Sequence, residues 1–377
     1  DPQTATFTRS SVAYLSDGTQ VAANVPRFEQ GKFGKAIMVE EGTTNLANNP
    51  TFSGAVGTTP SGWNSDVTIR QDDFFGQLIN VAELLCVSGN TYEDFGTSIA
   101  YPLAYNTTYT ISFWARGTME LTYELSTNRG IASATWKSKP PMSLQWQRYE
   151  VTIVTASSGS IFPFWWHLNN VNDVNVGKWV RIARIQLEQK PYATSFIDGT
   201  RADEKLTIPL EVLNHDAFTF EMRLKATEAC VDLSQCLLHL GAGMYIRNWR
   251  PLESNRGFAV DFSADESGKR QYIDLSHDTP FSTTEFESFV VTFNGSTFKF
   301  YRNGVLWGSK TPTKLYAFTQ IVFGAANWII DDLRISNRAR TDEEIAAAYA
   351  SGQPLPVDQY TTYKMGFDDT LQPTGKH

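Results

Sequence analysis

The stretch Trp328–Gly352 constrains the fold most, because it joins a buried strand to the one clear helix signal in the chain. Trp328–Ile330 is apolar and reads as the centre of a strand. Thr341 can cap a helix while Glu344 reaches back to the backbone, which is the capping-box pattern. We therefore expect a single short helix near residues 341–350, placed after the closing strand of a β domain.

The rest of the chain carries strand signals at a spacing of about ten residues. Apolar and polar residues alternate in Tyr109–Trp114, Tyr149–Val154 and Phe218–Lys225, as in antiparallel strands with one buried face. Asn294-Gly295 and Asn303-Gly304 each match the preferred type I′ hairpin pair. The pattern predicts an all-β fold of β-sandwich or jelly-roll domains.

A length of 377 residues predicts two or three domains. The net charge of −8 argues against general nucleic-acid affinity. The absence of a run of 18 apolar residues argues against membrane insertion. Three cysteines do not form a disulfide framework. Cys86 is expected in a core, whereas Cys230 and Cys236 fit a disulfide and two half-buried thiols equally well.

The second half of the chain resembles concanavalin A-like domains of the laminin-G type. The segments that carry this resemblance are Phe218–Leu224, Phe300–Gly304, Ile330–Arg338 and Thr341–Ile345. The middle of the chain resembles carbohydrate-binding jelly-roll modules, through Thr44–Phe52, Trp63, Asn106–Gly117, Trp146–Tyr149 and Arg184–Glu188. The order of the whole chain is similar to phage tail and other virion structural proteins, through Thr6–Ser10, Pro26–Phe28, Glu40–Leu46, Gln186–Glu188 and Thr194–Ile197.

The resemblance also implies an unusual connectivity. Gly31–Val39 looks like an early strand of a laminin-G-type domain, and in such domains it runs directly into a strand like Leu206–Pro209. Here about 150 residues intervene, so we predict that residues 44–197 form a jelly roll inserted into a sandwich made of residues 1–43 plus 198–377. Met365–Leu371 would complete the same sandwich or begin a further repeat.

Sugar rings stack on aromatic faces while neighbouring polar groups bind their hydroxyls. We predict a glycan platform on the middle unit, made of Trp114, Arg116, Trp136 (in an expected loop), Trp165, His167 and Arg184. The competing interpretation is core packing, which is the commoner role of a tryptophan on a sandwich strand.

Related β-sandwich modules carry structural calcium, which binds several carboxylate and carbonyl oxygens. The resemblance implies Asp331, Asp332 and Asp368 as its ligands. The alternative, which the sequence favours, is that these aspartates bind backbone amides or pair with Arg334 or Arg338.

Catalysis lacks support, because glycosidases need two carboxylates across the scissile bond and the family's Glu-x-Asp-x-Glu pattern is absent. The expected function is non-catalytic adhesion to a cell-surface or cell-wall glycan, on a virion or an extracellular surface, with other virion proteins or a homo-oligomer as partners. A purely structural virion part and a glycoside hydrolase are the alternatives.

Overall fold

The computed structural model describes residues 4–123, 127–209, 216–227, 236–240, 244–249, 257–262, 271–275, 281–314, 320–324 and 327–372. The chain forms two compact units. Unit 1 comprises residues 1–15, 20–42 and 201–377, and unit 2 comprises residues 16–19 and 43–200. Cys230 and the side chain of Cys236 lie outside the described residues, whereas Cys86 is buried.

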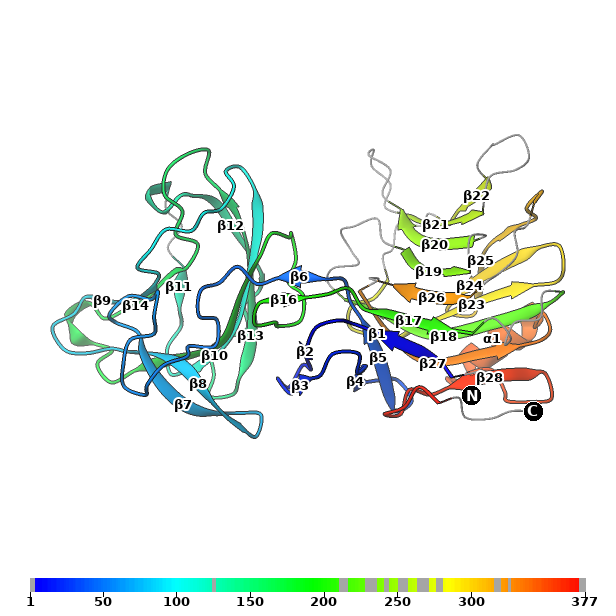
Figure 1. The fold of residues 1–377 in the computed structure, drawn as a ribbon, viewed down its shortest axis with the longest axis horizontal. Coiled ribbons are helices and arrows are strands. Elements are labelled where there is room, and N and C mark those ends of the chain that lie inside the picture. Colours follow the sequence, from blue (N-terminus) through cyan, green and yellow to red (C-terminus); the bar gives the residue numbers. More distant parts are fainter. Residues whose placement is uncertain are drawn as a thin grey trace. The chain divides into compact units, whose positions relative to one another are not determined.

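Unit 1 is built on two antiparallel sheets (Figure 1). The seven-stranded sheet has the order β1-β17-β26-β19-β20-β21-β22, and the other sheet has the order β25-β24-β23-β18-β27-β5-β4 with β28 paired to β27. The strands of the first sheet are β1 (Thr6–Thr8), β17 (Lys205–Ile208), β19 (Cys236–Leu240), β20 (Met244–Trp249), β21 (Gly257–Phe262), β22 (Gln271–Asp274) and β26 (Ile321–Gly324). Those of the second are β4 (Arg27–Gln30), β5 (Lys35–Val39), β18 (Phe218–Ala226), β23 (Glu287–Phe293), β24 (Phe298–Arg302), β25 (Val305–Lys310), β27 (Trp328–Ser336) and β28 (Thr361–Met365). A small ribbon pairs β2 (Ala13–Tyr14) with β3 (Gln20–Val21).

Strands from the start of the chain complete both sheets of unit 1. β5 pairs with β27, with Val39 opposite Trp328, and β1 pairs with β17, with Phe7 opposite Leu206. The inward side chains of the two sheets form one apolar core. That core therefore contains residues from both ends of the sequence.

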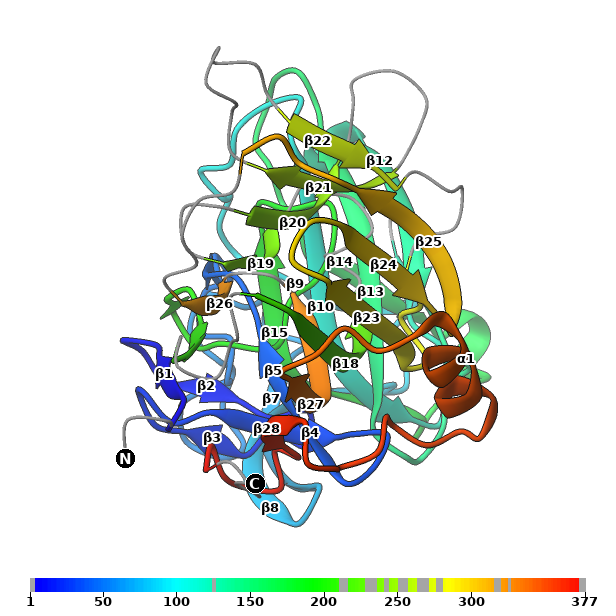
Figure 2. The same cartoon turned by 90° about the vertical axis from the view of Figure 1, so that its right-hand side faces the viewer.

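The helix α1 (Asp342–Ala350) begins and ends as the sequence predicts. The hydroxyl of Thr341 accepts the backbone N–H of Glu344, and the Glu344 carboxylate accepts the backbone N–H of Thr341. Ile345 packs with Val290 and Tyr301, so the helix covers the outer face of β23 and β24 (Figure 2). No helix in the described part of the chain is long and apolar enough to cross a membrane.

One of the two predicted type I′ hairpins is wrong. Asn303 and Gly304 both have positive φ, at 51° and 76°, as a type I′ turn requires. At the other turn only Gly295 has positive φ, because β23 ends at Phe293 and β24 begins at Phe298, which leaves a four-residue loop. The Asn294 side chain accepts the backbone N–H groups of Ser296 and Thr297 and stabilises that longer loop.

Unit 2 is a sandwich of a six-stranded sheet and a three-stranded sheet. The six-stranded sheet has the order β12-β13-β10-β15-β8-β7, and the three-stranded sheet has the order β11-β14-β9. The strands are β7 (Thr68–Phe74), β8 (Gln77–Leu85), β9 (Tyr92–Gly96), β10 (Thr108–Gly117), β11 (Thr122–Tyr123), β12 (Ile131–Ser138), β13 (Gln147–Thr155), β14 (Trp165–Asn169) and β15 (Trp179–Glu188), with 3-10 turns η1 (Thr127–Arg129) and η2 (Val171–Asp173). β6 (Thr43–Thr44) pairs with β16 (Thr200–Arg201) where the chain enters and leaves the unit.

The core of unit 2 follows the predicted alternation. Tyr109, Ile111 and Phe113 of β10 are buried between the two sheets, and Trp166 of β14 meets Phe113 from the opposite sheet. Across the residues that the structure describes, the nearly all-β architecture with one short α-helix confirms the predicted fold class.

Candidate functional site

The outer face of the six-stranded sheet carries three of the predicted platform residues. Trp114 packs against Phe74, Trp146 and Ala183 on this face. Arg116 is ion-paired with Asp72, and the Arg184 guanidinium lies 5.3 Å from the Phe74 ring centroid. These side chains are therefore held in a layer of their own outside the main core.

Trp136 lies on the other side of that sheet. It is in strand β12, opposite Val151, and not in the loop that the sequence predicted. Its ring packs against the main core, 6.5 Å from the ring centroids of both Tyr123 and Tyr149. The loop prediction failed because the polar and lysine-rich surroundings of Trp136 belong to the exposed face of an edge strand.

Trp165 and His167 lie on the three-stranded sheet and point away from the core, since Trp166 between them is fully buried. The Arg129 guanidinium sits 3.4 Å from the Trp165 ring centroid, and the ring also lies beside Gly96 on strand β9 and 6.4 Å from the Phe162 ring centroid. His167 contacts the ring of Tyr92.

The six predicted residues thus occupy three different places, and the structure does not bring them together as one platform. The alternation rule places each residue on a face of its own strand. It does not say which sheet of the sandwich that strand joins, which is why a shared platform could not be derived.

The β7–β8 hairpin displays an aromatic residue that the sequence analysis missed. Phe75 and Gly76 form the turn with φ of 51° and 86°, and Phe75 is 46% exposed. A bulky residue in the left-handed region is uncommon, because its Cβ crowds the backbone. The Phe75 ring lies 5.2 Å from that of Trp114 in an edge-to-face arrangement. The sequence signal that could have revealed this exposed residue is the turn pattern before Gly76.

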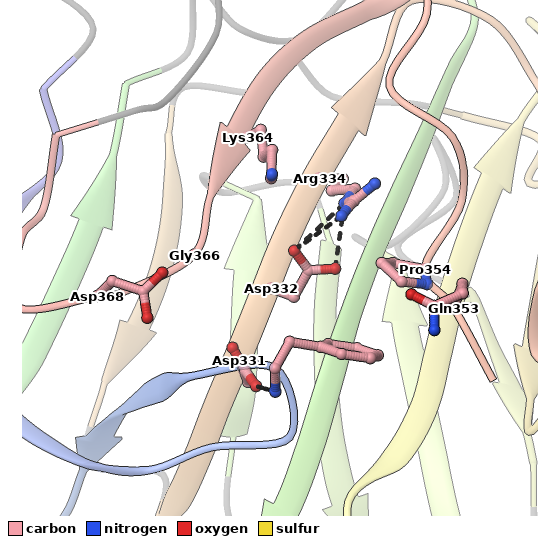
Figure 3. Close-up of a pocket in the computed structure, with 9 residues that line it drawn as sticks. Asp331, Asp332, Arg334, Gln353, Pro354, Lys364, Gly366 and Asp368 are labelled. Carbon is pink, nitrogen blue, oxygen red and sulfur yellow. Dashed lines mark hydrogen bonds and ion pairs between the residues drawn. The ribbon is translucent and has the colours of Figure 1, made fainter.

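A polar pocket of about 180 Å³ lies in unit 1 beside strand β27 (Figure 3). Its lining residues come from the β4–β5 turn, from β27 and β28, and from the segment after α1. They are Phe33, Asp331, Asp332, Arg334, Gln353, Pro354, Lys364, Gly366 and Asp368. A pocket of this volume holds several waters, which suits one small ligand group.

A β-bulge in β27 places three charged residues of this strand at the pocket. Ile330, Leu333 and Ile335 point into the core, so the inward positions are three and then two residues apart. The register with β18 shifts at this point, and Asp332 adopts a φ of 48°. Two residues of β27 therefore oppose one of its partner, as in a bulge. Asp331 and Asp332 consequently both face outward.

Asp331 binds the turn of the N-terminal hairpin. Its Oδ2 accepts the backbone N–H groups of Lys32 at 2.6 Å and Phe33 at 2.8 Å. Its side chain is almost completely buried, while its Oδ1 accepts no hydrogen bond from the described residues. Burial raises the pKa of this carboxyl more than the backbone N–H groups of Phe33, Lys32 and Asp332 lower it.

The other two predicted calcium ligands are also engaged by the protein. Asp332 accepts hydrogen bonds from Arg334 at 3.1 to 3.3 Å, and Asp368 accepts the backbone N–H of Lys35 at 3.0 Å. Within the described ranges, no group of three or more histidine, cysteine or acidic side chains is placed to hold a metal ion. Calcium at Asp331, Asp332 and Asp368 stays a prediction.

Phe33, Gln353 and Lys364 are pocket residues that sequence reasoning did not select. Phe33 is 36% exposed, with the Arg223 guanidinium 5.7 Å from its ring centroid. Lys364 lies opposite Arg334 in the β27–β28 pairing. Nothing in the local pattern marks these residues, because they meet only when β5, β27 and β28 pair.

Comparisons with known proteins agree with this fold. Residues 198–346 match the family model of the concanavalin A-like lectin/glucanases superfamily. Unit 1 thus contains a concanavalin A-like β-sandwich, as the sequence predicts. No curated protein matches the sequence.

Several solved structures have similar parts. The receptor-binding domain of a botulinum neurotoxin C/D mosaic serotype is 15% identical, with a TM-score of 0.32 over 40% of each chain. Domain 4 of an extracellular arabinanase from Geobacillus stearothermophilus, in complex with arabinotriose, is 15% identical, with a TM-score of 0.30 over 38% of this chain and 72% of that one. Tailspike protein 2 of the Escherichia coli O157:H7 bacteriophage CAB120 is 10% identical, with a TM-score of 0.34 over 45% of this chain and 26% of that one. The chain spans about two fifths of the length of the toxin binding domains that it matches.

Proposed function

We propose that this chain is a non-catalytic glycan-binding protein of a virion or an extracellular surface, and that the pocket beside β27 receives one sugar residue. The observation that carries the proposal is the combination of an exposed aromatic ring with hydrogen-bonding groups in a pocket of about 180 Å³. Phe33 supplies the ring, and Gln353 and Lys364 supply polar groups in the same pocket. Sugar sites need this pairing because one face of a pyranose is apolar while its edge carries hydroxyls.

The carboxylates of the pocket favour binding over hydrolysis. A glycosidase needs one carboxyl group that donates a proton and a second that is free to act as base or nucleophile. Asp332 is tied to Arg334, and Asp331 holds the Lys32–Phe33 backbone through one oxygen. The pair is therefore committed to the structure of the β4–β5 turn and of the bulge.

Weak binding at one pocket is sufficient for adhesion when many copies share a particle or a cell surface. Simultaneous engagement of several sites raises the overall avidity by about 10²–10⁴ without any new contact. Such a gain in avidity suits a shallow site with room for a single sugar residue. A homo-oligomer or an assembly with other virion proteins would supply the multiple copies.

A glycan array with the whole chain tests the proposal. We expect the wild type to bind and Phe33→Ala to lose about tenfold in affinity, which corresponds to about 1.4 kcal/mol of lost stacking. Phe75→Ala is the matched control, because it removes another exposed phenylalanine, from unit 2. The wild type should release no reducing sugar from the glycan that it binds.

Each result has a separate meaning. A wild type that binds no glycan would contradict the proposed function and favour a purely structural role in assembly. Binding that is lost in Phe75→Ala and kept in Phe33→Ala would retain glycan binding but move the site to the β7–β8 hairpin. Release of reducing sugar would identify a hydrolase.

A further inference from the structure

Five charged side chains form a row on the outer face of the six-stranded sheet of unit 2, which we call the arginine row. Its members, in order, are Arg70, Glu83, Arg181, Asp72 and Arg116. Glu83 accepts hydrogen bonds from Arg70 and from Arg181, at 2.8 Å each. Asp72 accepts them from Arg181 at 3.1 Å and from Arg116 at 2.9 Å. Three cations therefore share two anions, which leaves one positive charge that the row itself does not balance.

The strand pairing brings two of these cations together. Arg116 of β10 lies directly opposite Arg181 of β15, and like charges in that position repel each other. Asp72 binds both side chains and offsets part of this repulsion. Arg148 and Glu150 of β13 belong to the same face, but they pair with each other at 3.4 Å. They leave the positive charge of the row unbalanced, so the row attracts a ligand anion.

The guanidinium groups are the exposed part of the row. The side chains of Arg70, Arg181 and Arg116 are 41%, 25% and 24% exposed, against 8% for Glu83 and 5% for Asp72. Among the described residues, Arg70 donates a hydrogen bond only through Nε, and Arg181 only through Nε and Nη1. The remaining terminal nitrogens of these two side chains have no partner there and are not buried. The carboxylates thus hold the guanidinium groups in place while spare N–H donors meet the solvent.

The spare donors fit a carboxylate. A guanidinium group is a planar fork of N–H donors whose spacing matches the two oxygens of a carboxylate. The two terminal nitrogens of Arg70 present such a fork, and Nη2 of Arg181 supplies a further donor in the same row. A single excess charge suits a ligand that carries its carboxylates one at a time. The dense phosphate charge of a nucleic acid is instead repelled by the net charge of −8.

Aromatic side chains lie next to the row on the same face. Trp114 precedes Arg116 by two residues on β10, and both point outward. Phe75, which is 46% exposed, contacts Trp114, and the Arg116 guanidinium lies 5.2 Å from the Trp146 ring centroid. Surfaces that combine aromatic rings with fixed polar groups suit sugars. A carboxylate carried by a sugar therefore matches this face better than a small inorganic anion does.

We infer that the arginine row of unit 2 binds the carboxylate groups of an acidic oligosaccharide. The inference rests on the proposed function only in taking a glycan as the ligand, because the row shares no residue with the pocket beside β27. The chain then has two glycan sites of different chemistry, one on each unit. The site on unit 2 selects by charge, so a uronic acid binds there and its neutral derivative binds less well.

Two matched ligands test this selectivity: trigalacturonic acid and its full methyl ester. They share their rings and linkages, but only the acid carries negative charges. We expect the acid to bind the whole chain about tenfold more tightly than the ester, because a hydrogen bond to a charged group is stronger than one to a neutral group. Titration calorimetry or ligand-observed NMR measures the ratio. The advantage should shrink as salt is added, because screening weakens the attraction between charges.

Arg70→Gln is the decisive variant, because it removes the most exposed fork of the row. We expect the acid to bind this variant no more tightly than the ester does. Lys137→Gln is the matched control, since it removes one positive charge from an exposed position of β12 outside the row, and it should keep the preference. Thermal unfolding of both variants shows whether the sandwich is intact. It should be, because an ion pair as exposed as that of Arg70 adds little stability.

The outcomes separate this inference from the proposed function. Equal binding of acid and ester, failure of both to bind, a preference that survives in Arg70→Gln, or an equal loss in Lys137→Gln would overturn the inference. Tighter binding of a single-stranded oligonucleotide than of trigalacturonic acid would overturn it as well. None of these results touches the pocket beside β27, which depends on Phe33→Ala and the glycan array.

Discussion

A cluster of five buried charges ties the start of the chain to residues far along the sequence. Glu204 accepts hydrogen bonds from Arg9 at 2.8 Å and from Arg27 at 2.7 and 2.9 Å. Glu40 accepts from Arg27 at 2.7 Å and lies 3.3 Å from Arg201. Burial lowers the pKa of Arg27, but Glu204 and Glu40 raise it by more, so its charge is held firmly. The three arginines depend on the two glutamates for charge balance.

Glu204→Ala should destabilise unit 1 by about 3–5 kcal/mol, because it leaves buried arginines without their shared partner. Glu204→Gln should cost less, since it removes the charge but keeps the acceptor oxygen. The exposed Glu285→Ala in the same unit is the control and should stay within about 0.5 kcal/mol of wild type. Chemical denaturation measures the loss of stability, and hydrogen exchange in β5 and β17 shows where it occurs. A Glu204→Ala protein as stable as Glu285→Ala would show that the cluster contributes nothing.

Element by element, the alternation in the sequence correctly predicts which residues of a strand face the core between the sheets. It does so for Tyr109, Ile111 and Phe113, and for the strand and helix between Trp328 and Ala350. It wrongly predicts an exposed second face for Phe218–Lys225, because Thr219, Glu221 and Arg223 are buried as well. These signals are local, so they can be recognised without knowing the partner strand. Pairing between distant strands has no such signal, and for that reason Phe33 and Lys364 could not be placed at the pocket from the sequence.

In each unit, a bulge on a central strand interrupts the alternation. In β15 the inward residues are Ile182, Ile185 and Leu187, with Arg184 at a φ of 49°. In β27, Asp332 is the corresponding bulge residue, with a φ of 48°. Asparagine and aspartate accept this conformation more readily than arginine does. The bulges decide that Asp331 and Asp332 share one face, which strict alternation would have separated.

The capping box of α1 allows a test at the scale of one element. Thr341→Ala should destabilise the helix by about 1 kcal/mol, because the backbone N–H of Glu344 loses its acceptor. Thr341→Ser should behave like wild type, since it keeps the hydroxyl. Faster hydrogen exchange confined to α1 in Thr341→Ala would support the cap, whereas equal exchange in both variants would show that the packing of Ile345 alone holds the helix.

At the scale of the whole molecule, the chain leaves unit 1 and returns to it at one point. The backbone N–H of Glu204 donates to the carbonyl of Glu40 at 3.0 Å, and that of Asn45 donates to the carbonyl of Gly199 at 2.8 Å. The two connecting segments therefore run side by side. Closing the short gap between Gly42 and Arg201 would cost little loop entropy, because the ends are already adjacent.

Deleting residues 43–200 and joining Gly42 to Arg201 through two glycines should leave a folded unit 1. The reason is that β1, β4 and β5 pair within unit 1, and the Arg9, Arg27 and Glu204 cluster needs no residue of the deleted segment. We expect a single cooperative unfolding transition, with glycan binding at the pocket beside β27 unchanged within about twofold. The control is the same deletion with Glu204→Ala, which should unfold at lower denaturant concentration. A deletion protein that fails to fold would show that residues 43–200 are needed to hold the N-terminal strands in place, and the two units would then have to be treated as one folding unit.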